Sequence, residues 1–134
     1  MDAGAFVAYW HEKDDAHEAV KGVMEELRSK PLRPVTIRLV IAEAVTGLAR
    51  FVTVRHAIRV GREIEGWAAR RLQILEPSGE DYARALELME RCDEPSLTYQ
   101  DCVAFSIMRR LRIRLAFTTD RRHFGGLGGF TVVP

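Results

Sequence analysis

Apolar residues recur at helical spacing in several long segments of the chain, and these segments are separated by proline, glycine and polar loops. Residues 15–29 show the pattern first, with Val20, Val23 and Leu27 on one face, and Pro31 and Pro34 follow. The same spacing predicts further helices over 38–50, 54–70, 80–91 and 99–112. In the 54–70 segment the residues expected to face the core are Val54, Ala57, Ile58, Ile64, Trp67 and Ala68.

Short apolar runs lie between these predicted helices. They occur at residues 35–37, 72–77, 114–119 and 130–134, while the glycine-rich stretch 125–129 is typical of a flexible turn. Strands that alternate with helices of this length favour a parallel sheet covered on both faces. We therefore expect one α/β domain over residues 1–134, with a central, mostly parallel sheet of four to five short strands.

Glu43 is an unusual residue within the predicted helix 38–50. Leu39 and Val40 lie one turn back on the same face, and further apolar side chains surround it in the sequence. A carboxylate on an apolar face is costly unless it is protonated, paired with a cation or bound to a metal ion. Helix capping does not explain an acid in the middle of a helix, so Glu43 is a candidate functional residue.

Three other acids stand at the ends of predicted elements. Asp2 begins an apolar stretch, Asp101 begins the helix 99–112, and Asp120 follows the strand 114–119. Each also has an ordinary structural explanation, because Thr98 and Asp101 have capping-box spacing and Asp120 could be a turn residue. If the strands ending at 2, 37 and 119 lie side by side, these acids and Glu43 converge. Such a cluster of oxygen ligands suits Mg²⁺ or Mn²⁺.

The composition is that of a globular protein, with 47% hydrophobic and 29% charged residues. No apolar run is long enough to cross a membrane, and no signal peptide is recognisable, so we expect a cytoplasmic protein without a membrane partner. Cys92 and Cys102 are expected to be free thiols. Arginines gather between 109 and 122, a pattern that suits a polyanionic ligand but also an ordinary solvated face.

The order of these motifs resembles that of PIN-domain proteins, and most closely the VapC-type toxins of toxin–antitoxin pairs and their solitary relatives. The resemblance rests on "DAGAFVAYWHEKDDAHEAV" at the start, "VIAEAVTGL" around Glu43, "LTYQDCVAFSIMRRLRIRLAFTTDRRHF" from residue 97, and the closing "GFTVVP". It covers essentially the whole chain. No single motif is specific, whereas the ordered set of four at these separations is.

The resemblance implies a PIN-like three-layer fold and a ribonuclease that depends on Mg²⁺ or Mn²⁺. By position, the metal-binding catalytic acids would be Asp2, Glu43 and Asp101, with Asp120 as the fourth, more variable one. Thr118 would form a hydrogen bond within the site. Arginines such as Arg112 and Arg114 would hold the RNA backbone or dock a cognate antitoxin, and the protein would form a homodimer.

The chain departs from the family pattern at two places, which keeps a second interpretation open. Ala3 stands where a small hydroxyl residue often follows the first acid, and only Met1 precedes Asp2, where several apolar residues normally form the central strand. The α-amino group would then oppose cation binding with its charge. The alternative function is a catalytically inactive PIN-like module that binds RNA or protein, although the intact set of four acids speaks against it.

We expect, from the single residue before Asp2, that the natural start lies upstream of Met1 or that the chain is clipped. The protein expressed from its native locus should therefore be heavier than these 134 residues. Intact-mass spectrometry measures this directly, and a mass equal to that of the 134-residue chain would refute the expectation.

Overall fold

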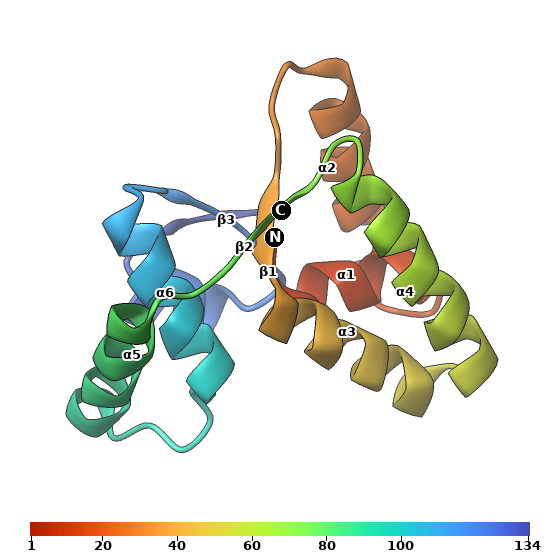
Figure 1. Ribbon diagram of the computed structural model, residues 1–134. Coiled ribbons are helices and arrows are strands. Elements are labelled where there is room, and N and C mark those ends of the chain that lie inside the picture. The colour runs from red at the N-terminus through yellow and green to blue at the C-terminus, as the bar shows by residue number, and fades with distance from the viewer.

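The computed structural model describes residues 1–134 as short parallel strands flanked by helices on both sides (Figure 1). The helices are α1 (Ala3–Trp10), α2 (His17–Ser29), α3 (Arg38–Phe51), α4 (Val54–Ala68), α5 (Gly79–Cys92) and α6 (Tyr99–Arg110). The strands are β1 (Val35–Ile37), β2 (Gln73–Leu75), β3 (Leu115–Phe117) and β4 (Thr131–Val133), and a π-helix, η1 (Arg121–Leu127), precedes β4.

The strands form two parallel pairs, β1 with β2 and β3 with β4. The first two residues of the chain lie between the pairs, because the Met1 α-amino group donates to the Val35 carbonyl at 2.7 Å and the Asp2 amide donates to the Phe117 carbonyl at 2.9 Å. The predicted architecture of short parallel strands flanked by helices is confirmed. The expected single sheet is divided, since two residues are too few to form a strand that would join the pairs.

The helices form two groups around these strands. Figure 1 shows α5 and α6 on one side of the strands and α1 to α4 on the other. One buried apolar cluster extends through both groups, and its largest fully buried side chains include Phe6, Leu48, Ile64 and Phe105. The space between α3 and α6 is therefore set by a shared core, and the carboxyl end of β3 opens toward it.

Two segments differ from the sequence-based expectation. Residues 3–10 form helix α1, which the pattern did not reveal because nearly every residue in it is apolar and no polar face marks the helical period. Residues 125–127 belong to η1, so only Gly128 and Gly129 form the turn, and Gly129 has the positive φ of 72° that favours glycine.

The α4 face was also predicted in part wrongly. Ala57, Val60 and Ile64 are buried, whereas Val54 and Ile58 are 63% and 50% exposed. The apolar stripe of α4 extends beyond the surface with which α4 contacts α3. A prediction from periodicity alone therefore placed Val54 and Ile58 in the core. They contribute instead to an exposed apolar surface at the start of α4.

The tryptophans and cysteines have structural roles. The rings of Trp10 and Trp67 stack at 4.8 Å between their centroids, and Tyr9 packs edge-on against both. Cys92 and Cys102 are free thiols, as expected. None of the helices is long and apolar enough to span a bilayer.

An ion pair between buried Asp81 and partly exposed Arg110 joins α5 to α6. Asp81 completes the capping box that its spacing from Ser78 predicts, and its fully buried carboxylate accepts hydrogen bonds from Arg110 Nε at 3.0 Å and Nη2 at 2.7 Å. The guanidinium of Arg110, together with the bonds from Ser78, holds the pKa of Asp81 well below its usual range. Asp81 therefore stabilises the helix pair that carries Asp101.

We predict that Asp81→Ala lowers the free energy of unfolding by about 2 kcal/mol at pH 7, because it removes a cap and buried hydrogen bonds. A carboxylate with a lowered folded-state pKa contributes its stability above the unfolded-state pKa of about 4 and loses it as the pH falls through the folded-state value. Urea titrations at pH 7 and pH 2.5 should therefore show a smaller loss at the lower pH. Arg109→Ala, a change at an exposed neighbour, is the control, and equal losses at both pH values would contradict the prediction.

Candidate active site

Asp2 is held at the carboxyl end of β3 by contacts from two segments. Its side chain caps α1, accepting from the Gly4 amide at 3.3 Å, and the buried Thr118 hydroxyl donates to the same oxygen, Oδ2, at 2.9 Å. A Cβ on Gly4 would lie 2.4 Å from the Thr119 Oγ1, so glycine permits this close approach. The first acid is therefore fixed against the segment 118–120.

Thr118 also connects Asp2 to Asp120. Its Oγ1 accepts a hydrogen bond from the Asp120 amide at 3.0 Å while its hydroxyl proton goes to Asp2. One buried hydroxyl thus orients one acid through its side chain and the other through its backbone.

Asp101 lies at the amino end of α6 and completes a second capping box. Its Oδ2 accepts from the Thr98 amide at 3.0 Å and from the Thr98 hydroxyl at 2.7 Å. The other oxygen, Oδ1, accepts no hydrogen bond from the protein and remains accessible to solvent. The capping spacing read from the sequence is confirmed, and it leaves half of the carboxylate free.

Glu43 lies at the border of the buried face of α3. Val40, Ile41 and Ala44 are buried in the core, whereas Glu43 is half-buried. No ion pair and no hydrogen bond from the protein reaches its carboxylate. The residue is therefore less enclosed than its apolar neighbours in the sequence suggest, and it faces the space that the other acids border.

The four carboxylates lie close enough to influence one another. Burial, followed by the charges of Asp2 and Asp101, raises the pKa of Glu43. Burial also raises the pKa of Asp101, against the lowering effect of its bonds from Thr98, and the charges of Asp2 and Asp120 raise it further. No lysine or arginine forms an ion pair with any of these acids. The protein leaves a negative charge here that a bound cation would compensate.

The donor chemistry suits a hard divalent cation, since every candidate ligand is a carboxylate oxygen. Asp2 and Asp101 each retain one oxygen, and Glu43 both, without a hydrogen bond from the protein. As the side chains stand, however, no three His, Cys, Asp or Glu residues converge closely enough to hold a metal ion. The carboxylate oxygens suit such an ion by their chemistry. The carboxylate side chains would have to rotate toward one another to bind it.

Asp120 is bound differently from the other acids, through a contact that the sequence analysis missed. Both of its oxygens are engaged with His123, Oδ1 with the backbone amide at 2.9 Å and Oδ2 with Nδ1 at 2.5 Å. The other ring nitrogen of His123 lies 3.0 Å from the Ser96 hydroxyl. The spacing of three residues between Asp120 and His123 was the available signal, but the contact to Ser96 depends on the tertiary fold.

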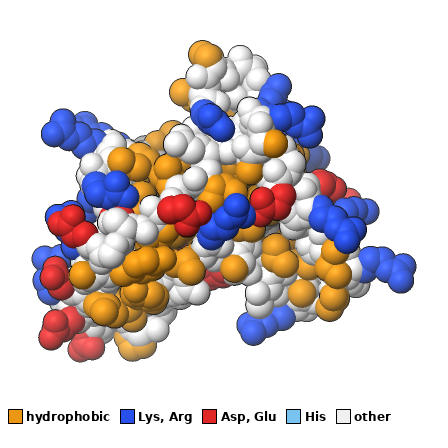
Figure 2. All heavy atoms as spheres, in the orientation of Figure 1, with side chains coloured by type: hydrophobic (Ala, Val, Ile, Leu, Met, Phe, Trp, Pro, Cys, Tyr) orange, Lys and Arg blue, Asp and Glu red, His pale blue; other side chains and the backbone are white.

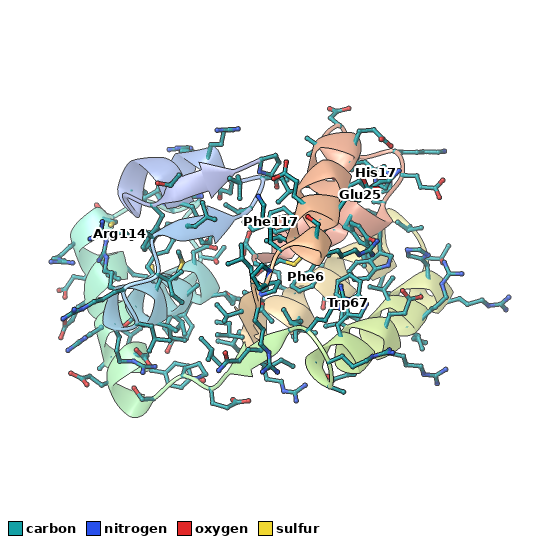
Figure 3. The ribbon with its side chains drawn as sticks, turned by 90° about the horizontal axis from the view of Figure 1, so that it is seen from above. Phe6, His17, Glu25, Trp67, Arg114 and Phe117 are labelled. Atoms are coloured by element: carbon teal, nitrogen blue, oxygen red, sulfur yellow. The ribbon has the colours of Figure 1, made fainter.

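The arginines predicted to support the site lie far from it. Arg112 and Arg114 follow the carboxyl end of α6, whereas Asp101 begins that helix, so the helix alone separates them by roughly 14 Å. Figure 3 shows Arg114 well away from Phe117, the residue at the site end of β3. The structure therefore does not bring Arg112 or Arg114 to the four acids.

Neighbouring arginines are occupied by other partners. Arg110 binds Asp81, Arg122 pairs with Glu94, and Arg121 donates to the carbonyl of Pro134. The arginine cluster seen in the sequence is thus divided among structural contacts and a surface remote from the acids.

Comparisons with known proteins agree with this architecture. The family model of the PIN domain matches residues 1–127. The crystal structure of Mycobacterium tuberculosis VapC20, a sarcin-ricin loop cleaving toxin, is similar with a TM-score of 0.82, covering 99% of this chain and 97% of that chain at 24% sequence identity. At this identity the likeness concerns the fold alone. A search of curated proteins found no match.

We predict that Glu43→Gln stabilises the metal-free protein, because it removes one of several mutually repelling charges. A carboxylate whose pKa is raised on folding costs stability as the pH rises from its unfolded value through its folded value. Urea titration in EDTA should show a gain of about 0.5 kcal/mol at pH 7.5, small because solvent screens a half-exposed group, and less at pH 5. Glu63→Gln, at an exposed unpaired acid on α4, is the matched control. A loss of stability at pH 7.5 would refute the proposed repulsion.

Proposed function

The chain belongs to the PIN domain family, and from that premise we propose that it is a metal-dependent endoribonuclease. The observation that carries the proposal is the set of four carboxylates at the amino ends of α1 and α6, within α3 and just after β3. Burial, and after it the charges of the neighbouring acids, raises the pKa of Glu43 and Asp101, and no basic side chain neutralises Asp2, Glu43 or Asp101. A site that retains such charge is suited to bind a cation together with a phosphate.

The reaction follows from the ligands. Asp2, Glu43 and Asp101 would hold Mg²⁺ or Mn²⁺, which when bound lowers the pKa of water and stabilises charge on phosphate oxygens. Water attacks phosphorus in line, the bond from phosphorus to O3′ breaks, and the products carry a 5′-phosphate and a 3′-hydroxyl. Thr118 keeps the Asp2 carboxylate oriented, and Asp120 contributes negative charge from its position beside them.

We further propose that the protein acts as the toxin of a toxin–antitoxin pair in the cytoplasm. Support comes from the fold it shares with VapC20, a toxin that cleaves the sarcin-ricin loop. A cognate antitoxin and a second copy of the chain are then the expected protein partners. The exposed apolar residues Val54 and Ile58 on α4 offer surface for either one.

One observation favours a second candidate, a catalytically inactive module that binds RNA or protein. No three acids are placed to hold a metal ion without side-chain movement. If the carboxylates stay apart in solution, the fold would serve for binding only.

The test is cleavage of end-labelled single-stranded RNA in Mn²⁺ or Mg²⁺, with EDTA as the negative condition. We expect metal-dependent cuts by wild type and by the surface control Glu63→Gln. Glu43→Gln should lose at least about a hundredfold in rate, because it removes a charged ligand at the reacting centre.

The outcomes separate the candidates. Cleavage that survives in Glu43→Gln would remove this residue from the site. Absence of cleavage by folded wild type on several RNAs would favour the binding module instead.

A further inference from the structure

An open groove continues from Glu43 along the outer side of α3 to its carboxyl end. It encloses a cavity of about 470 Å³, which lies within the range of roughly 300–1,000 Å³ that is typical of small-ligand sites. Leu39, Glu43 and Gln100 line it toward the amino end of α3, and Arg50 and Phe51 line it at the carboxyl end. Because Gln100 directly precedes Asp101, the groove adjoins the acid cluster.

Phe51 is the least buried large apolar side chain of the molecule, with 68% of its surface exposed. Its ring lies beside Gly47, one turn earlier, where a Cβ would be 3.9 Å from the ring. No other aromatic ring packs against it, in contrast to Phe6, Trp10 and Phe105. An aromatic face therefore stands free at the end of the groove.

The polar side chains of the groove are also without partners. Arg50 makes no ion pair and no side-chain hydrogen bond, whereas Arg38, Arg84 and Arg110 are all paired. The amide of Gln100 likewise forms no hydrogen bond within the chain. A free cation, a free amide and a free aromatic ring thus border one cavity next to the four acids.

We propose that this groove binds single-stranded RNA next to the scissile phosphate, with a base stacked on Phe51 and a backbone phosphate held by Arg50. Gln100 would donate and accept hydrogen bonds at a base edge or ribose. Stacking on an aromatic side chain requires an unstacked base, so the groove selects single strands over duplex. This inference rests on the proposed nuclease function, because it takes the acids as the place of cleavage.

Charge and continuity favour RNA over a protein at this site. The groove joins the acid cluster through Glu43, and its cationic residue lies beyond the acids, where the next phosphate would pass. The rival occupant is a second copy of the chain, since Val52, Val54 and Ile58 extend the exposed apolar surface beyond the groove. Figure 2 shows apolar side chains gathered at the end where α3 meets α4, with basic side chains around them.

The experiment uses a short single-stranded RNA that contains 2-aminopurine, a base whose fluorescence falls when it stacks. Binding is measured in EDTA, so that metal-dependent cleavage does not interfere. We expect quenching on binding to wild type, and a loss of about tenfold in affinity with Phe51→Ala. Phe51→Trp should retain both affinity and quenching, whereas Phe51→Leu, which is apolar but has no π face, should behave like Phe51→Ala.

Arg50 is tested in the same assay. Arg50→Ala should weaken binding and reduce its dependence on salt concentration, because one phosphate contact is lost. Leu86→Ala, at an exposed apolar residue of α5 that does not line the groove, should leave affinity and quenching as in wild type. Light scattering on each variant reports the oligomeric state in parallel.

Four outcomes would overturn the inference. Unchanged binding by Phe51→Ala, equal binding by Phe51→Leu and Phe51→Trp, or no RNA binding by wild type would each refute it. So would a change from dimer to monomer in Phe51→Ala with RNA affinity intact, because the face would then be an interface between copies. Wild type that binds and quenches in EDTA, yet never cleaves with metal, would uphold the groove and refute the nuclease.

Discussion

The main-chain hydrogen bonds of the first two residues hold the two halves of the molecule together. Met1 donates to Val35 of β1 and accepts from the Thr36 hydroxyl at 2.9 Å, while the Asp2 amide donates to Phe117 of β3. These bonds connect β1 and β3, which share no strand pairing of their own. The same hydrogen bonds at the junction of β1 and β3 fix the position of the Asp2 carboxylate. The placement of the first acid and the connection between the strand pairs therefore depend on the same contacts.

Burial at this junction also alters the charge expected beside Asp2. The α-amino group of Met1 has its pKa lowered to about 6, chiefly by desolvation, with the charge of Asp2 acting in the opposite direction. At neutral pH most of these amino groups are then uncharged. The lowered pKa of this amino group therefore weakens the opposition to cation binding that the sequence suggested.

The fold tolerates these like charges because three of the four acids cap helices. Asp2 caps α1, Asp101 completes the box at α6, and Asp120 caps η1. Backbone amides and the positive end of the helix dipole stabilise a carboxylate at each of these places. Glu43 alone has no such support, so it is the acid that would gain most from the proposed cation.

The sequence revealed those parts of the fold whose signals are local. Capping spacings at Ser78 and Thr98 predicted where α5 and α6 begin. The charges of Asp2 and Asp120 act on Asp101, but no three acids converge on one metal position, so the four-acid site stays a prediction. Helix α1 was not predicted from the sequence, because nearly every residue in it is apolar and no polar face marks the helical period. The hydrogen bond between His123 and Ser96 depends on how segments far apart in the sequence pack together. The distance of Arg114 from the acids depends on the direction of α6. No local sequence pattern contains either piece of information.

If the chain is the nuclease proposed above, the placement of charge limits how RNA would approach. Asp101 lies at the amino end of α6, whereas Arg112 and Arg114 follow its carboxyl end, so these arginines would not contact a phosphate held at the acids. Helix α3, in contrast, carries Glu43 and Phe51 on one rigid element, separated by about 12 Å of helix. A base resting on Phe51 would then stand at a fixed distance from the cut. Any base preference exerted there would select the position of cleavage along the strand as well as the identity of the RNA.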